Sequence, residues 1–177
     1  MFPEISLHIL DIAQNAVRAG ASRIEIRVTE RAGELTAVIR DNGCGMTPGQ
    51  CARAADPFVT SRTERRVGLG IPFIKLAAEL TGGRFSLESA AGRGTAVTAV
   101  FRTGHIDCMP LGDLSGTVFA LVTANPGLDF LFVHTVGERS ETMDTRAFRA
   151  VLGDVGLDTP DVKRYIREYL DEMNREL

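Results

Sequence analysis

A carboxylate and two closely spaced glycines stand together in residues 41–46, which read Asp-Asn-Gly-Cys-Gly-Met. The preceding residues Leu35, Ala37 and Ile39 alternate in the manner of a strand, and Asp41 continues their apolar face. A carboxylate on that face needs a partner, because an unpaired buried charge is costly. The glycines allow backbone to pack closely beside it. Residues 41–46 therefore hold either a ligand-binding carboxylate or an ordinary Asn-Gly turn.

The pair Asp11 and Asn15 is a second candidate. Residues 5–19 carry apolar side chains at helical spacing, and residues four apart lie one turn above another on a helix. The amide oxygen of Asn15 suits Mg²⁺, a hard cation that prefers oxygen ligands and phosphate. The alternative is an exposed polar edge of the helix.

Two glycines, Gly68 and Gly70, form a third candidate. They precede a helix that ends near Leu80 and has Pro72 in its first turn. Backbone N–H groups at a helix start favour phosphate. The residues before these glycines lack periodicity and predict a basic loop, which has a solvated surface as its alternative role. Loop side chains that can face a phosphate are Thr60, Ser61 and Arg62, with Arg65 and Arg66 as counter-charges.

Helices and strands must position these groups. Thr95 begins the apolar face of a strand beside Gly94, as Asp41 ends one. A short helix over residues 47–56 is expected, with Thr47 as its N-cap. The strands expected in this part of the chain cover residues 24–28, 35–41, 85–89 and 95–101.

The C-terminal part of the chain begins with a connection over residues 103–115, rich in Gly, Pro and Asp. Two strand-like runs then predict a hairpin, which consists of Val118–Thr123 and Leu128–Val136 joined at Asn125-Pro126-Gly127. Helices are expected over residues 146–152 and 161–176. The apolar stripe of the last helix includes Tyr165, Tyr169 and Met173, and it predicts packing on its own core or, alternatively, contact with a partner.

The composition of the 177 residues excludes several classes. The net charge of −3 provides no basic footprint for nucleic acid. No apolar run reaches the roughly 18 residues that a membrane span needs, and the start does not read as a signal peptide. The three cysteines are odd in number and lack CxxC spacing, which favours reduced thiols. We therefore expect a cytoplasmic protein without nucleic-acid or membrane contact.

Four features now follow one another: Asp11 with Asn15, Asp41 with its glycines, a basic loop ending in Gly68-Leu69-Gly70, and a strand that opens with Gly94-Thr95. In this order, residues 5–102 resemble the GHKL ATPases, the superfamily of gyrase, histidine kinases and MutL. The segment from Asn15 to Met46 looks like MutL. The segment from Asp56 to Ile71 looks like the lid and second glycine box of histidine kinases.

The resemblance implies an α+β fold, a two-layer α/β sandwich. Its mixed, mostly antiparallel sheet would carry helices on one face, followed here by a C-terminal hairpin and two helices. We expect three segments: an ATP-binding domain over residues 1–102, a linker over 103–115 and an extension over 116–177.

The resemblance also implies ATP and Mg²⁺ as ligands. Asp41 would accept a hydrogen bond from the exocyclic amine of adenine, and Thr95 would add another directly or through water. Asn15 would bind Mg²⁺, and Asp11 stands where hydrolysing relatives place a general-base Glu. The other residues that the resemblance assigns to the nucleotide are Gly43, Gly45, Met46, Thr60, Ser61, Arg62, Gly68, Leu69 and Gly70.

Asp11 is one methylene shorter than that glutamate, so hydrolysis is expected to be slow. We therefore expect a stand-alone protein with weak ATPase activity or an ATP-dependent regulatory switch acting on an unidentified protein partner. Two alternatives stay open. One is a protein kinase acting in trans, like anti-sigma-factor kinases or histidine kinases, and the other is a non-catalytic nucleotide sensor. A homodimer through the last helix is also expected as an alternative to packing on its own core.

Overall fold

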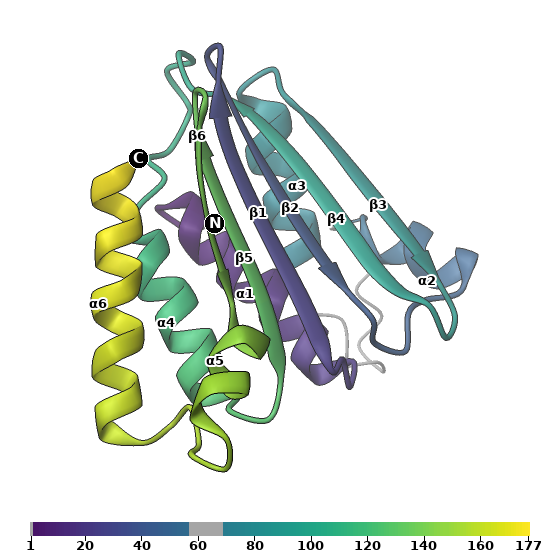
Figure 1. Cartoon of the computed structure of the whole chain (residues 1–177). Helices are drawn as coiled ribbons and strands as arrows, with labels where there is room; N and C mark the ends of the chain where they lie inside the picture. Colours follow the sequence, from purple (N-terminus) through teal and green to yellow (C-terminus); the bar gives the residue numbers. More distant parts are fainter. Residues whose placement is uncertain (1, 57–68) are drawn as a thin grey trace.

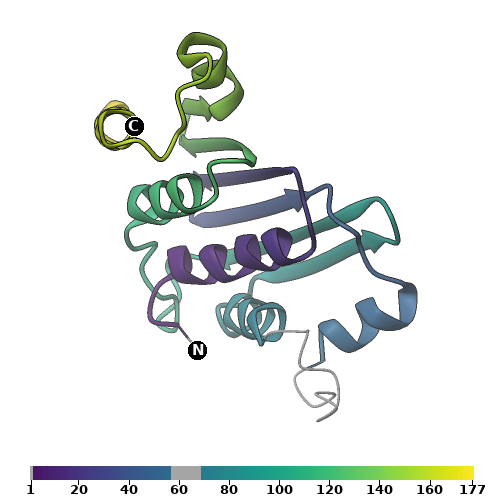
Figure 2. The ribbon, with the colours of Figure 1, turned by 90° about the horizontal axis from the view of Figure 1, so that it is seen from below.

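One sheet of six strands organises the protein, in the order β3-β4-β2-β1-β5-β6 (Figure 1). The structure is a computed structural model that describes residues 2–56 and 69–177. Helices α1, α3 and α4 lie against one face of the sheet (Figure 2). The strands are β1 (Arg23–Arg31), β2 (Glu34–Asp41), β3 (Arg84–Ala90), β4 (Gly94–Arg102), β5 (Asp129–Val136) and β6 (Arg139–Asp144); the helices are α1 (Ile5–Arg18), α2 (Pro48–Ala54), α3 (Gly70–Leu80), α4 (Leu114–Ala124), α5 (Thr145–Leu152) and α6 (Pro160–Glu176).

Alternation along the central strands builds the core. In β2, Leu35, Ala37 and Ile39 are buried, as the sequence predicts, and they face α1 and the other covering helices. The intervening side chains of β2 point to the opposite, helix-free face. Helix α1 contributes Ile5 and Ile9 to the same core. The α+β fold class and its mixed, mostly antiparallel sheet are therefore confirmed, since only β1 and β5 pair in parallel among the described strands.

The N-terminal elements agree closely with the sequence predictions. Helix α1 ends at Arg18, and the turn after β1 centres on Ala32 and Gly33, which both adopt positive φ. Thr47 caps α2 in a capping box, because its hydroxyl accepts from the Gln50 N–H at 3.3 Å while the Gln50 side chain accepts from the Thr47 N–H at 2.8 Å.

The predicted strand Val118–Thr123 is wrong, because these residues belong to helix α4. The run is apolar on nearly every side, and such a run does not separate a buried strand from a buried helix by periodicity. The helix start was readable nevertheless: Asp113 is the N-cap and accepts a hydrogen bond from the Gly116 N–H at 2.7 Å. Val118, Leu121 and Val122 are buried beneath the sheet.

The hairpin of the C-terminal part is formed by β5 and β6, not by residues 118–136. It turns at Gly137, which has a φ of +59°, and Glu138. Strand β5 pairs in parallel with β1, and a parallel pair needs a long crossover connection. Helix α4 lies within that connection. Strands β5 and β6, which follow residue 113, therefore extend the same sheet. The division into an ATP-binding domain, a linker and an extension is a statement about folding units, and it stays a prediction.

Helix α6 packs against α4 and β6. Its buried stripe comprises Val162, Ile166, Leu170 and Met173, so the expected packing on its own core is confirmed. Two tyrosines lie outside this stripe: Tyr165 is 53% exposed, and the Tyr169 hydroxyl donates to the Thr142 carbonyl of β6 at 3.0 Å. Across residues 2–56 and 69–177, no helix combines the length and apolar character that crossing a bilayer requires.

Candidate functional site

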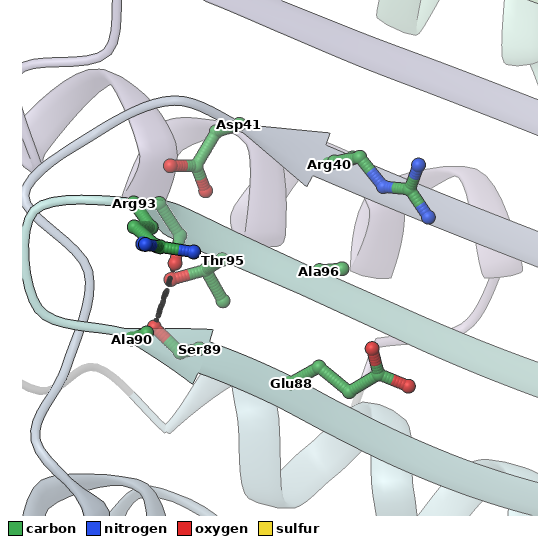
Figure 3. Close-up of a pocket in the computed structure, with 9 residues that line it drawn as sticks. Arg40, Asp41, Glu88, Ser89, Ala90, Arg93, Thr95 and Ala96 are labelled. Carbon is green, nitrogen blue, oxygen red and sulfur yellow. Dashed lines mark hydrogen bonds between the residues drawn. The ribbon is translucent and has the colours of Figure 1, made fainter.

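Three polar side chains stand in one row across the ends of β2, β4 and β3. The strand register pairs Asp41 with Thr95 and Thr95 with Ser89, so all three point to the helix-covered side of the sheet. The hydroxyl oxygens of Ser89 and Thr95 lie 2.8 Å apart. Figure 3 draws this hydrogen bond as a dashed line. The sequence predicted Asp41 and Thr95 as partners in one site, and the register makes them direct neighbours.

A shallow hollow surrounds these strand ends (Figure 3). It includes the next row of the sheet, Arg40–Ala96–Glu88, which points to the helix-free face because it is one residue out of phase. The residues that line the hollow are Arg40, Asp41, Glu88, Ser89, Ala90, Arg93, Gly94, Thr95 and Ala96.

The carboxylate of Asp41 is half-buried and forms no ion pair with another described residue. Its Oδ1 accepts a hydrogen bond from the Gly43 N–H at 2.7 Å. Burial raises the pKa of Asp41 above its usual range, and the backbone N–H groups of Gly43 and Thr95 partly oppose that rise. Asp41 thus keeps acceptor capacity that the protein itself does not use, as a group that recognises a ligand donor must.

The loop after Asp41 is held by backbone contacts that only glycine permits. Gly45 adopts a φ of +64°, and a methyl group there would lie 1.9 Å from the Ala90 carbonyl oxygen. Gly43 fits against the end of α1, where a methyl group would lie 2.9 Å from Ala19. The Cys44 N–H donates to the Ala19 carbonyl at 2.9 Å. These contacts join the loop both to α1 and to the β3–β4 turn, so the loop cannot relax as a free turn would.

Helix α1 brings Asp11 and Asn15 to the start of α3. Gly70 opens α3 directly against them, since a methyl group on Gly70 would lie 2.0 Å from Asp11 Oδ2 and 3.6 Å from Asn15 Nδ2. The Asn15 amide oxygen accepts a hydrogen bond from the Arg18 guanidinium. The same guanidinium nitrogen lies 4.0 Å from Asp11 Oδ1. Leu69 is the exposed N-cap of α3. Gly70 thus meets Asp11 and Asn15 of α1, a contact that the order of residues along the chain does not reveal.

The comparison with known proteins now decides the family. Residues 4–105 match the family described as histidine kinase-, DNA gyrase B-, and HSP90-like ATPase. That match covers more than half of the chain and contains the whole row at the strand ends. The chain belongs to this family, the GHKL ATPases. The resemblance to GHKL ATPases that the sequence indicated is confirmed.

Relatives of this GHKL domain include sensor and division kinases. The cell-division control histidine kinase PdhS of Brucella anthropi is 32% identical over 108 residues, 52% of this chain and 10% of the relative. A probable C4-dicarboxylate sensor kinase of Bacillus subtilis is 31% identical over 85 residues, 48% of this chain and 16% of the relative. The chain thus spans only a small part of the length of these kinases.

Solved structures share the fold at low identity. The ATPase domain of MutL from Aquifex aeolicus, complexed with ADP, superimposes with a TM-score of 0.53 at 11% identity, covering 98% of this chain and 70% of that one. The N-terminal domain of a DNA repair protein gives a TM-score of 0.54 at 13% identity, covering 81% and 53%. The likeness to MutL extends to nearly the whole chain, beyond the GHKL match.

The described residues of this GHKL domain fit Mg²⁺ in the way that nucleotide-bound Mg²⁺ is usually held. Mg²⁺ takes one or two protein ligands and completes its shell with water and phosphates. Asn15 has one amide oxygen, which accepts from Arg18 in this structure, so Mg²⁺ would replace the Arg18 side chain, which is 58% exposed. Outside residues 1 and 57–68, no cluster of three His, Cys, Asp or Glu side chains forms an all-protein metal cage.

Several predicted site residues lie outside the described part of the chain: Thr60, Ser61, Arg62 and Gly68. Sequence reasoning also missed two residues. Ser89 completes the row at the strand ends, and Asn42 ties the loop to the β1 start by accepting from the Ser22 and Arg23 N–H groups, each at 2.9 Å. Ser89 was detectable, because it is in phase with Phe85 and Leu87 and so continues their face toward the glycine turn.

Proposed function

We propose that this GHKL domain binds ATP with Mg²⁺ and uses it as a slow ATPase or as an ATP-dependent regulatory switch. The observation that carries the proposal is the half-buried Asp41 carboxylate at the Thr95 register position, which forms no ion pair with another described residue. A carboxylate acceptor in that setting matches a neutral donor such as the exocyclic amine of adenine. A base that lacks the amine leaves the acceptor unpaired, which penalises its binding.

The phosphate end of the site has Asn15, Asp11 and the start of α3. Asn15 would hold Mg²⁺, which neutralises phosphate charge when bound. The first N–H groups of α3 are unpaired within the helix and favour an anion. Asp11 lies against Gly70 at this helix start, where a carboxylate can take a proton from an attacking water. These contacts support Asp11 as the candidate general base, although its side chain is shorter than a glutamate.

The alternative of a kinase acting in trans draws support from the names of the curated relatives, of which this chain spans a small part. His8 does not serve as an internal phosphoacceptor in this arrangement, because its side chain is only 1% exposed. In a kinase, Asp11 would orient or deprotonate the acceptor hydroxyl or imidazole of a partner. In a pure sensor, Asp11 would have no catalytic task and ATP would bind without turnover.

Binding is tested by thermal unfolding with and without Mg·ATP. ATP at about 100 times its Kd adds roughly 2.7 kcal/mol of stability, a shift of several degrees for a chain of this size. The variant Asp41→Asn should lose that shift, because its amide cannot provide the carboxylate acceptor. It should stay folded, because the amide oxygen still accepts from the Gly43 N–H.

The matched control for Asp41→Asn is Asp154→Asn, which removes an exposed carboxylate far along the chain from the strand ends. It should retain the full ATP-dependent shift. If Asp41→Asn also retains the shift, the assignment of the adenine site is wrong.

The fate of ATP labelled at the γ-phosphate separates the three roles. Free phosphate released by the native chain alone supports the ATPase, and Asp11→Asn should then reduce release at least 100-fold while the ATP-dependent thermal shift persists. Transfer of the labelled phosphate from ATP to a partner protein supports the kinase acting in trans. Binding without release or transfer, unaffected by Asp11→Asn, supports the sensor.

A further inference from the structure

The hydroxyl group of Ser89 makes three hydrogen-bond contacts at the edge of the candidate adenine site. Its Oγ accepts from the Met46 N–H at 2.9 Å, and it lies 2.9 Å from the Gly94 carbonyl oxygen. The third contact is the Thr95 hydroxyl at 2.8 Å. Ser89 therefore joins the glycine loop, the β3–β4 turn and the row that contains Asp41. The catalytic and binding roles proposed above do not use it.

Counting protons fixes the direction of these hydrogen bonds. A serine hydroxyl has one proton and can accept two hydrogen bonds. The Gly94 carbonyl oxygen can only accept, so the Ser89 hydroxyl donates its single proton to it. Ser89 then accepts from both remaining groups, the Met46 N–H and the Thr95 hydroxyl. Only this arrangement satisfies all three contacts, and it commits the single Thr95 proton to Ser89.

Thr95 consequently presents lone pairs and no proton to a ligand. Its neighbour Asp41, when ionised, is also an acceptor only. Two adjacent acceptors at the ends of β2 and β4 match a ligand group that donates two protons, and they oppose one that carries an acceptor. The amine at position 6 of adenine is such a donor, whereas the oxygen at position 6 of hypoxanthine or guanine is an acceptor.

We propose that Ser89 is a positioning residue that sets the base preference of the site by fixing Thr95 as an acceptor. The proposal rests on the proposed function, because it concerns the same nucleotide site. Ser89 acts through Thr95 and does not itself touch the base. Its removal should therefore relax discrimination between 6-amino and 6-oxo purine nucleotides, beyond any general loosening of the loop.

The test measures the Kd of Mg·ATP and of Mg·inosine triphosphate for the native chain and for Ser89→Ala. In the variant the Thr95 proton is released and can be donated to a ligand oxygen. The preference for ATP, expressed as the ratio of the two Kd values, should fall about tenfold, which is the scale of one hydrogen bond. Loss of the Met46 contact alone should weaken both nucleotides alike and leave the ratio unchanged.

Matched variants separate positioning from structure. Ser86→Ala removes an exposed hydroxyl three residues away, on the opposite face of the same strand, and should change nothing. Ser89→Thr keeps the hydroxyl and should restore the native ratio. In a Thr95→Val background, Ser89→Ala should have no further effect on the ratio, because Ser89 acts through the Thr95 hydroxyl.

The outcomes distinguish this inference from the proposed function. If the native chain prefers ATP and Ser89→Ala keeps the native ratio, the inference is overturned while nucleotide binding stands. If the native chain binds neither nucleotide, the proposed function fails and the role of Ser89 fails with it. A lowered ratio that Ser89→Thr restores supports the inference.

Discussion

Adjacent polar residues at the end of β2 have opposite tasks. Asp41 points to the covered side of the sheet and keeps an unused acceptor. Asn42 points outward, where its oxygen accepts from Ser22 and Arg23 and its amide nitrogen donates to the Ser22 hydroxyl at 2.8 Å. Asn42 is thus a structural clamp between the β2 end and the β1 start. The turn that Asn42 stabilises holds Asp41 in place at the strand end.

The buried His8 makes stability depend on acidity. Both ring nitrogens lack a hydrogen-bond partner among the described residues, and burial lowers the pKa of His8 to about 4. As the pH falls from 6.5 to about 4, His8 binds a proton in the unfolded chain but stays neutral in the folded chain. Stability should therefore fall as the pH falls through this window, by about 2 to 3 kcal/mol from this residue.

Urea unfolding at pH 7 and pH 4.5 checks this prediction for His8. The variant His8→Leu should lose less stability over that interval than the native chain, because it no longer titrates. His105→Gln, at an exposed histidine, provides the control and should follow the native profile. Equal losses for His8→Leu and the native chain would contradict the prediction.

Among the elements, α1 and α3 meet where the phosphate end of the site is proposed. Their close approach depends on Gly70, which contacts the Asp11 carboxylate without a side chain between them. Gly70→Ala should gain helix propensity of about 1 kcal/mol. The added methyl group would nevertheless lie 2.0 Å from Asp11 Oδ2, so the carboxylate would have to turn out of its contact with α3. We expect a net loss of about 1 to 3 kcal/mol in the free energy of unfolding.

Chemical denaturation of Gly70→Ala measures this loss, and Asp11→Ala in the same chain should recover most of it, because the clashing carboxylate is then gone. Gly104→Ala is the matched control, since a methyl group there meets nothing within 4 Å. A Gly70→Ala chain as stable as the native one would show that α1 and α3 are not packed in this way.

On the scale of the whole molecule, the C-terminal part belongs to the same sheet as the candidate nucleotide site. Strand β5 pairs with β1, and Arg149 of α5 binds the β5 start through the Asp129 carboxylate at 3.2 Å and the Leu128 carbonyl at 2.9 Å. The candidate site and α5 are therefore attached to one continuous hydrogen-bonded sheet. The surface of the C-terminal part would be the output of the proposed switch.

That surface includes an aromatic cluster of Phe148, Tyr165 and Tyr169, with ring centroids 5.3 to 6.3 Å apart. The apolar stripe of α6 is buried in the protein's own core. A dimer or partner that contacts α6 would therefore meet these rings and not the buried stripe. A homodimer through α6 stays a prediction. Sedimentation of the native chain and of Tyr165→Ser, with and without Mg·ATP, would detect it.

The sequence alone determined the local pattern: which residues form α1, the strands β1 to β4 and the capped α2, and that Asp41 faces the apolar side. Period and capping are properties of neighbouring residues, so they are readable without a fold. It also determined the family, because the order of Asn15, Asp41, Gly70 and Thr95 is a property of the chain.

Tertiary structure decided what depends on distant segments. The uniformly apolar run of α4 is a helix that packs against α1 and α6, which lie far from it in the sequence. Strand register, which no local pattern contains, placed Ser89 beside Thr95 and so directed its proton. Helix packing placed Gly70 on Asp11. Asp41 lies among three strand ends and the end of α1, and these are brought together only by the fold.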